Sequence, residues 1–188
     1  NIKLLIPEVR ESGHGIVPTS STTAQLAIGD AIAIALMNQK KFGKLDFKKF
    51  HPSGSLGKKL KTVEDLMVVK DKIPFIDENS SLKKTIQIIN SKKLGVVVIR
   101  NKRMETTGIF TDGDIKRTIQ KKSKSINDLK IKMHMTKNPI SINKDILAAK
   151  ALEVMNRKKI TSLCVHNNNK KKTIGILHVH NLISAGIL

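Results

Sequence analysis

A histidine stands where two differently composed stretches of the chain meet. His51 is followed by a proline, two serines and two glycines in the stretch HPSGSLG, residues 51–57. A neutral imidazole can transfer protons near pH 7, and glycines let the backbone approach a ligand closely. A linker explains the small residues but not the histidine. From these residues alone, a histidine that caps or packs at a domain join is the better interpretation, and acid–base chemistry is the alternative.

A run of hydroxyl side chains precedes an apolar segment that should form a helix. Free N–H groups and the helix dipole favour an anion at a helix N-terminus, and the hydroxyls add hydrogen-bond donors. Simple capping of the helix needs only one of them. We expect at least one of the four to face a bound substrate. The run consists of Thr19, Ser20, Ser21 and Thr22.

Other candidate ligands and nucleophiles carry less weight. His178 and His180 flank a valine, and two alternating histidines alone are weak support for a metal, so we predict no metal site. The single cysteine, Cys164, lies in an apolar run and is expected to be an inert core thiol. One cysteine permits no disulfide within the chain, which fits a reducing cytoplasm.

The composition favours a globular protein with an aliphatic core. The chain has 188 residues, of which 39% are hydrophobic and 3% aromatic, enough for one large or two small domains. No segment approaches the length of a membrane span, so we expect no membrane partner. The net charge of +20 invites a nucleic-acid interpretation. Only five of the 35 basic residues are arginine, however, and the lysines are scattered through every segment, so we predict no nucleic-acid partner.

The first stretch of the chain must position the hydroxyl run. Residues Ile2–Ile6 read as a short buried strand that ends at Pro7. Residues Ala24–Gln39 read as a helix that is apolar nearly all round, so we expect it to be buried. The threonines and serines before this helix are natural N-caps, and the lysines after it suit its C-terminus.

The second stretch, from about Lys61 onward, contains an internal repeat. Gly108 and its counterpart Gly175 lie 67 residues apart, and Met67 and Met135 lie 68 apart. Offsets that agree so closely indicate a duplicated unit. Each unit has a lead segment, a helix, two strands and a second helix, and we expect the two units to bury their sheet faces against each other. The predicted helices and strands are Leu82–Lys92, Gly95–Arg100, Glu105–Phe110 and a helix from Asp112, then Ile146–Lys158, Ser162–His166 and Thr173–Leu177.

The two units resemble a tandem pair of CBS domains in their order of elements, their methionine-containing lead segments and the Gly-x-x-Thr-x-x-Asp step. The first stretch resembles the sugar-isomerase (SIS) domain that precedes a CBS pair in arabinose 5-phosphate isomerases. The matching motifs are PTSST at residues 18–22, Gly29-Asp30-Ala31, HPSGSLG at residues 51–57 and GIFTDGD at residues 108–114.

The resemblance implies an α/β fold in three parts. The C-terminal part of a SIS domain occupies residues 1–57, one CBS domain occupies 58–125, and a second occupies 126–188. The chain begins without a methionine in an apolar run, so we expect it to start partway through the SIS domain. With the family's main phosphate-gripping loop absent, we expect this chain alone to be inactive.

The resemblance also implies an activity. It would be an aldose–ketose isomerase that interconverts D-ribulose 5-phosphate and D-arabinose 5-phosphate, the precursor of the Kdo sugar of bacterial lipopolysaccharide. The reaction needs a base for the proton between C1 and C2, an acid for the oxygens and an anchor for the phosphate, but no cofactor. The enzyme is expected to be a cytoplasmic homo-oligomer, a tetramer in the family.

Two residues of the first stretch take catalytic roles by resemblance. His51 matches a histidine of the active site, which reverses the interpretation from the residues alone. Glu11 lies where the family has a glutamate that could serve as the enediol base, with Glu8 as a competitor. A surface carboxylate is the alternative for Glu11.

The repeat offers a possible nucleotide site by resemblance. Thr111 and Asp114 match the residues with which CBS pairs hold a nucleotide, the threonine near phosphate and the aspartate on ribose hydroxyls, whereas the second unit has His178 and Asn181 at these places. Two alternatives stay open at this point. One is a regulatory module that binds a nucleotide or nucleotide-sugar without catalysis, and the other is a CBS pair that serves oligomerisation only.

Overall fold

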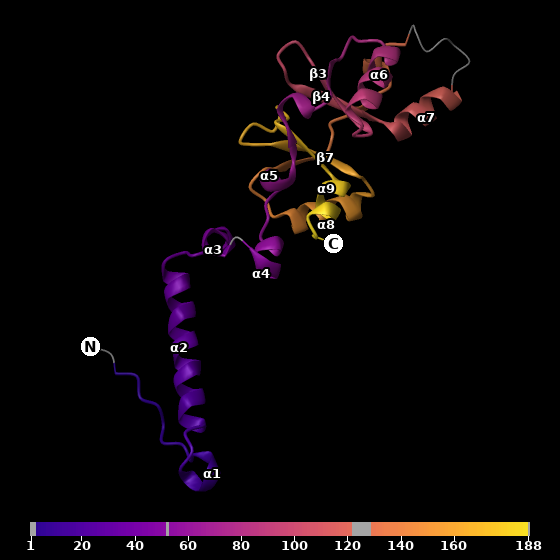
Figure 1. The fold of residues 1–188 in the computed structure, drawn as a ribbon. Helices are drawn as coiled ribbons and strands as arrows, with labels where there is room; N and C mark the ends of the chain where they lie inside the picture. Colours follow the sequence, from indigo (N-terminus) through magenta and orange to yellow (C-terminus); the bar gives the residue numbers. More distant parts are fainter. Residues whose placement is uncertain (1–2, 52, 122–128, 188) are drawn as a thin grey trace. The chain divides into compact units, whose positions relative to one another are not determined.

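A computed structural model describes residues 3–51, 53–121 and 129–187 (Figure 1). The chain divides into two compact units, Asn1–Phe50 and His51–Leu188, whereas the sequence predicted a boundary after Gly57. The other predicted boundary, between residues 125 and 126, lies outside the described residues.

The first unit is helical. Its elements are α1 (Ser12–Gly15), α2 (Ser20–Gln39) and α3 (Lys44–Phe50). Ile2 lies outside the described residues, and residues 3–6 of the predicted strand form no strand. A strand needs a hydrogen-bonded neighbour, and the described part of this unit offers these residues none.

Helix α2 differs from the prediction in its surroundings. We predicted it to be buried, but it contains no buried residue, and Leu26 is 67% exposed. Because its apolar residues lie all round, it needs partners on every side, and the described residues of this unit do not supply them. The expectation that no segment reaches the length of a membrane span is also wrong, since this 20-residue helix is long and apolar enough to cross one. A single such helix is weak support for a membrane location because core helices pass the same test.

The second unit contains both repeats. The first repeat forms α5 (Val63–Leu66), β1 (Val68–Val69), η1 (Lys70–Lys72), β2 (Phe75–Asp77), α6 (Leu82–Lys92), β3 (Val96–Arg100), β4 (Thr106–Thr111) and α7 (Asp112–Lys121). The second repeat forms η3 (Ile131–Met133), β5 (Thr136–Lys137), β6 (Ser141–Asn143), α8 (Ala148–Lys158), β7 (Ser162–His166), β8 (Gly175–His178) and α9 (Val179–Ser184). A short helix, α4 (Gly54–Lys59), precedes them. The predicted elements of the repeats are confirmed, and each predicted end lies within two residues of the observed end.

Local signals explain where the repeat helices begin and end. At the start of α6, the Ser81 side chain accepts a hydrogen bond from the backbone N–H of Lys84 at 3.3 Å, an N-cap. After α6 and α8, Lys93 and Lys159 adopt left-handed conformations with φ of 55° and 53°. Helices commonly end in this conformation, and local backbone hydrogen bonds accompany it here, from Lys93 N–H to the Ile89 carbonyl and from Ile160 N–H to the Met155 carbonyl, each at 3.0 Å.

The lead segments of the two repeats are exchanged. Strand β1 of the first repeat pairs antiparallel with β8 of the second, placing Val68 opposite Ile176. Strand β5 of the second repeat pairs antiparallel with β4 of the first, placing Lys137 opposite Gly108. The sheets therefore have the orders β1-β8-β7-β6 and β2-β3-β4-β5, and each sheet takes one edge strand from the other repeat.

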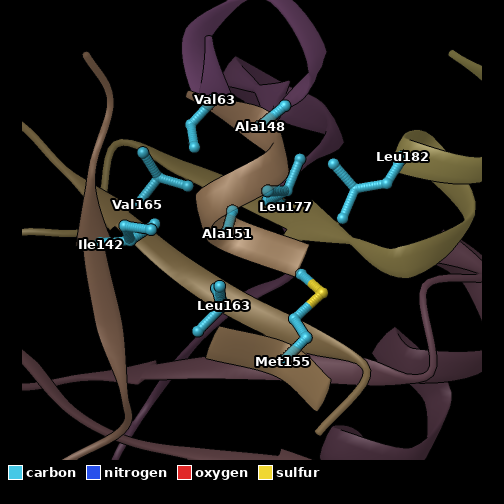
Figure 2. Close-up of a cluster of buried hydrophobic side chains, with 9 residues drawn as sticks. All are labelled: Val63, Ile142, Ala148, Ala151, Met155, Leu163, Val165, Leu177 and Leu182. Atoms are coloured by element: carbon cyan, nitrogen blue, oxygen red, sulfur yellow. The ribbon is translucent and has the colours of Figure 1, made fainter. Parts of the chain in front are cut away.

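The hydrophobic core follows the same exchange. Figure 2 shows Val63, from the first repeat, among side chains of the second repeat, including Ala148, Leu177 and Leu182. Conversely, Ile131 of the second repeat packs in the core of the first. Each lead segment thus belongs structurally to the partner repeat.

A third core cluster joins the two sheets. Successive residues of β3 alternate between faces, with Val97 and Ile99 in the core of the first repeat and Val96 and Val98 in the inter-sheet cluster. Cys164 lies in that cluster, 4% exposed. Burial raises the pKa of its thiol to about 11. The predictions of face-to-face sheets and of a thiol in the core are confirmed.

Candidate functional site

A reciprocal hydrogen-bond pair begins helix α7. The Thr111 hydroxyl donates to Asp114 Oδ2 at 2.8 Å, and the Thr111 backbone N–H donates to the same oxygen at 2.9 Å. The other carboxylate oxygen of Asp114 accepts from Arg117 Nη2 at 2.6 Å. Asp114 is only 8% exposed, so it is held between a threonine and an arginine. The arrangement fixes both side chains at the start of the helix.

Thr111 lines a cleft of about 410 Å³, which we call the threonine cleft. This volume lies in the range of small-molecule sites. Its walls combine apolar residues with hydroxyls, an acid and two cations. The residues that define it are Ile109, Thr111, Asp112 and Arg117 from the first repeat and Ile140, Lys159, Ile160 and Thr161 from the second. Asp114 is not among its lining residues, so it acts on the cleft through Thr111 and Arg117.

The cleft offers different chemistry at its different walls. The isoleucines can contact the faces of a flat apolar ring. The guanidinium of Arg117 and the ammonium of Lys159 can pair with a phosphate. The hydroxyls of Thr111 and Thr161 can donate to or accept from a bound ligand. This combination suits a nucleotide.

The second repeat builds a related cleft, of about 310 Å³, which we call the histidine cleft. It is lined by Lys93, Leu94, Gly95, Asp112, His178, His180 and Asn181. His178 and Asn181 repeat the pairing of Thr111 and Asp114, since the His178 backbone N–H donates to Asn181 Oδ1 at 3.0 Å. Both clefts therefore place a left-handed lysine of one repeat opposite a capped helix start of the other.

The structure brings Glu11 to the hydroxyl run. Glu11 Oε2 accepts from the backbone N–H groups of Thr19 at 2.7 Å and Ser20 at 2.8 Å, and Oε1 accepts from that of Ser21 at 3.1 Å. Hydrogen bonds from the Ser21 side chain and the Thr19 backbone are the largest causes that lower the pKa of Glu11 to about 2. The anion that the sequence predicted at this helix start is therefore, in this structure, a carboxylate of the chain itself.

The hydroxyls of the run are also engaged. Thr19 Oγ1 lies 3.2 Å from Glu11 Oε2, Ser20 Oγ donates to the Arg10 carbonyl at 2.9 Å, and Thr22 Oγ1 donates to the Thr19 carbonyl at 2.8 Å. A ligand at this helix start would have to replace these local hydrogen bonds.

His51 opens the second unit and is exposed. It is therefore not placed relative to Glu11 and the hydroxyl run, which belong to the first unit. For the segment after it, a linker was one explanation of the small residues. Pro52 lies outside the described residues, and Gly54–Gly57 begin helix α4 instead.

Sequence reasoning missed three charged residues of the threonine cleft. Asp112, Arg117 and Lys159 were not singled out, although all three line it. The available signal was spacing: Arg117 follows Asp114 by three residues, which places the two side chains on one face of a helix. Lys159 comes to the cleft from the other repeat, and the sequence pattern does not reveal how the two repeats pack.

The fold and the paired clefts define a class of protein. The CBS domain family matches residues 63–121 and 126–187, and the chain belongs to this family. Within it, the chain is 39% identical over 175 residues to the arabinose 5-phosphate isomerase KdsD of Salmonella typhimurium, covering 93% of this chain and 52% of that protein. The same figures hold for the enzyme of that name from Escherichia coli (strain K12). An uncharacterized protein, RP505, of Rickettsia prowazekii is 37% identical over 98% of this chain and 56% of its own length.

These comparisons place the chain among proteins like arabinose 5-phosphate isomerase. The chain spans about half the length of the curated relatives that it matches. The matched residues include both repeats, and the predicted tandem CBS pair is confirmed.

Solved structures confirm the fold. The CBS pair of protein MJ0100, in complex with 5′-methylthioadenosine and S-adenosyl-L-methionine, is similar with a TM-score of 0.59 at 18% identity, over 66% of this chain and 94% of that one. The CBS domain protein PAE2072 from Pyrobaculum aerophilum, complexed with AMP, gives a TM-score of 0.58 at 18% identity over 65% of this chain and 90% of that one.

Proposed function

We propose that this chain belongs to an aldose–ketose isomerase that interconverts D-ribulose 5-phosphate and D-arabinose 5-phosphate. The observation that carries the proposal is the 39% identity along 93% of the chain to enzymes named for the second sugar phosphate. The reaction moves one proton from C1 to C2 through an enediol and adjusts the protons on O1 and O2, so it consumes no electrons and needs no cofactor. A side chain that takes up and returns a proton near pH 7 suffices.

His51 is the residue that we propose for this proton transfer. A neutral imidazole can take up and return a proton, and His51 is exposed. Glu11 suits the role of base less well, because a carboxylate with a pKa of about 2 takes up a proton poorly near neutral pH. We infer that Glu11 holds the start of helix α2 in the conformation that the hydroxyl run needs. Glu8 remains the competing carboxylate for the role of base.

The hydroxyl run is proposed to contribute to the phosphate anchor. The backbone N–H groups at the start of α2 already hold one anion, the Glu11 carboxylate, so the site has the charge preference that a phosphate requires. Among Thr19, Ser20, Ser21 and Thr22, we expect at least one hydroxyl to exchange its local partner for the substrate.

The isomerase proposal is tested by following ribulose 5-phosphate isomerisation. The assay compares this chain with a version extended at its N-terminus to the length of the curated relatives, each with and without His51→Ala. His14→Ala is the matched control, because His14 is an exposed histidine with no proposed role. We expect the extended protein to turn over, His51→Ala to lose most of that rate while staying folded, and His14→Ala to keep it. A folded, extended protein that leaves ribulose 5-phosphate unchanged contradicts the substrate assignment.

The CBS pair is proposed to regulate the enzyme by binding a nucleotide in the threonine cleft. We place the base between the isoleucines and the phosphate between Arg117 and Lys159. Thr111 is positioned to contact the phosphate, and Asp112, as a lining carboxylate, to accept from ribose hydroxyls. Asp114 supports this site through its bonds to Thr111 and Arg117.

A regulatory module without catalysis is the second candidate, because the threonine cleft lies wholly within the CBS pair. Calorimetric titration of AMP into the full chain distinguishes the cases. Binding that Arg117→Gln weakens at least tenfold supports the nucleotide site, since a charge-assisted bond to phosphate is then lost. If the extended protein binds AMP but does not isomerise ribulose 5-phosphate, the regulatory module without catalysis becomes the better interpretation.

The resemblance also leads us to propose a homotetramer. Light scattering of the extended protein tests this by measuring its molar mass in solution.

A further inference from the structure

The histidine cleft differs chemically from the threonine cleft, although the repeat relates them. In place of the threonine hydroxyl it presents His178, and in place of a glycine it presents His180. The two rings stack, with centroids 5.0 Å apart and an interplanar angle of 27°. A stacked pair of imidazoles beside a lysine offers hydrogen-bond donors for an anion and no apolar gap for a nucleoside base.

The hydrogen bonds of His178 fix which of its nitrogens faces the ligand. Its Nδ1 accepts from the backbone N–H of His180 at 3.2 Å. The proton of the neutral ring therefore lies on Nε2, which can donate a hydrogen bond. Burial, and then the neighbouring His180, lower the pKa of His178, so the ring is neutral near pH 7 when no anion is bound.

The charges that line the cleft are balanced without the histidines. Among the described lining residues, the charged or titratable groups besides His178 are Lys93 after helix α6, Asp112 at the start of α7, and His180 on α9. The lysine and the aspartate cancel each other. A phosphate monoester carries close to two negative charges at neutral pH, so its binding favours protonation of the histidine pair.

We propose that the histidine cleft binds a small phosphorylated polyol, of the sugar-phosphate class, with uptake of a proton by the His178–His180 pair. Lys93 and the two imidazoles hold the phosphate, and the Asp112 carboxylate accepts from a ligand hydroxyl. The volume of about 310 Å³ is smaller than that of the threonine cleft, which fits a ligand without a base. This site shares Asp112 with the proposed nucleotide site and otherwise has its own polar residues. The proposal depends neither on nucleotide binding nor on the proposed isomerase reaction.

The proton uptake predicts the direction in which the affinity changes with pH. Because the bound anion raises the pKa of the pair, the gain in affinity is complete below the free pKa and is lost as pH rises through the bound pKa. If binding requires one proton on the protein, affinity falls by at most about tenfold per pH unit above the free pKa, so by at most about 100-fold between pH 6 and pH 8. The ligand phosphate itself ionises near pH 6, which offsets about twofold of this loss.

The test is calorimetric titration of the full chain with D-ribose 5-phosphate near pH 6 and near pH 8, repeated in two buffers of different ionisation enthalpy. The difference between buffers reports the protons taken up. Inorganic sulfate, which does not titrate in this range, is the second probe and shows whether the linked proton belongs to the protein. The expected result is tighter binding of both probes at the lower pH, with proton uptake.

Four variants locate the binding. His180→Gln removes an exposed imidazole of the proposed pair, and it should lower the affinity for ribose 5-phosphate at least fivefold near pH 6 and flatten the pH dependence. His178→Asn keeps an acceptor for the start of α9 and should do the same. His14→Gln should leave binding unchanged, because His14 does not line this cleft. Arg117→Gln reports any binding of the probes in the threonine cleft, which Arg117 lines.

Several outcomes would overturn the proposal. They are the absence of binding near pH 6, binding that His180→Gln leaves intact, and binding that Arg117→Gln abolishes, which would place the sugar phosphate in the threonine cleft. Binding of sulfate without ribose 5-phosphate would refute the ligand class. Because binding is the readout, failure here is distinct from failure of the isomerase assay.

Discussion

The exchange of lead segments predicts that adding one methyl group, in the variant Gly108→Ala, lowers the stability of the fold strongly. A Cβ added to Gly108 would lie 2.7 Å from Met135 Sδ and 2.8 Å from the carbonyl oxygen of Thr136. Both neighbours belong to the lead segment of the second repeat, and Thr136 begins strand β5, which pairs with β4. The methionine can rotate away, but the carbonyl belongs to the backbone. Gly108→Ala must therefore shift the backbone of β4 or β5 and weaken their pairing.

The size of the effect follows from these distances. Overpacking in a filled core typically costs about 1–3 kcal/mol, and a clash with backbone places Gly108→Ala at about 2–3 kcal/mol. For a domain of this size, about 2–4 °C of melting temperature is lost per kcal/mol, so we expect a decrease of roughly 5–10 °C. Gly175→Ala should cost less, because its nearest backbone atom, the Val68 carbonyl oxygen, is 3.2 Å away and the remaining contacts are with the flexible Met67 side chain.

Thermal and urea unfolding of the full chain, followed by circular dichroism, measure these changes. Gly113→Ala is the control, because its nearest neighbour is the guanidinium of Arg117 at 3.4 Å, on a side chain that is 64% exposed and can move. Hydrogen exchange should also show faster exchange of the β5 amides in Gly108→Ala. The reasoning is refuted if Gly108→Ala stays within about 0.5 kcal/mol of the wild type, or if Gly113→Ala costs as much.

Three further predictions concern single side chains. The folded pKa of Glu11 is lowered to about 2 from an ordinary 4.5, so its stabilisation of helix α2 is complete above about pH 4.5 and is lost as pH falls toward 2. Amide chemical shifts in the first turn of α2 should therefore titrate near pH 2, and Glu11→Gln should remove this titration. A midpoint near pH 4.5 would contradict the geometry. Asp114→Ala removes the side chain that accepts from Thr111 at the start of α7 and pairs with Arg117. It should lower the free energy of unfolding in urea by about 0.5–2 kcal/mol. An unchanged free energy of unfolding would show that water replaces the carboxylate. Cys164, buried with a pKa of about 11, should react with a thiol reagent only as fast as the protein unfolds, and rapid labelling of the native protein would show that the inter-sheet core opens.

The elements of the repeat could be predicted because their signals are local. The helix Leu82–Lys92 and the strand Ser162–His166 were predicted with the bounds that the structure has. In the helix, the buried residues Leu82, Thr85 and Ile89 recur with the helical period. In the strand, a short and largely apolar run is buried throughout. The tandem CBS pair followed from the order of these elements and the equal offsets between the repeats.

The positions of the lead segments could not be predicted in the same way. A strand of two residues such as β1 carries almost no periodicity, and nothing in its sequence says which sheet it joins. The threonine cleft likewise combines residues of both repeats, with Thr111 from the first and Lys159 from the second. Sequence reasoning therefore found Thr111 and Asp114 by resemblance but not the cations of the cleft.

The burial of helix α2 was mispredicted for a related reason. An apolar helix indicates a need for partners, but it does not show whether the described part of the chain contains them. Likewise, a glutamate before a helix start can be a base or a cap. Only the hydrogen bonds of Glu11 to the backbone of Thr19, Ser20 and Ser21 decide what it does in this structure.

The exchanged edge strands also bear on how such a chain can arise. Neither repeat can complete its sheet from its own sequence, because β1 and β5 each lie in the other sheet. The topology is that of a domain-swapped homodimer whose two subunits have been joined end to end. Covalent joining makes the swap independent of protein concentration, and it frees the two halves to diverge. One ancestral residue can then become Thr111 in one cleft and His178 in the other.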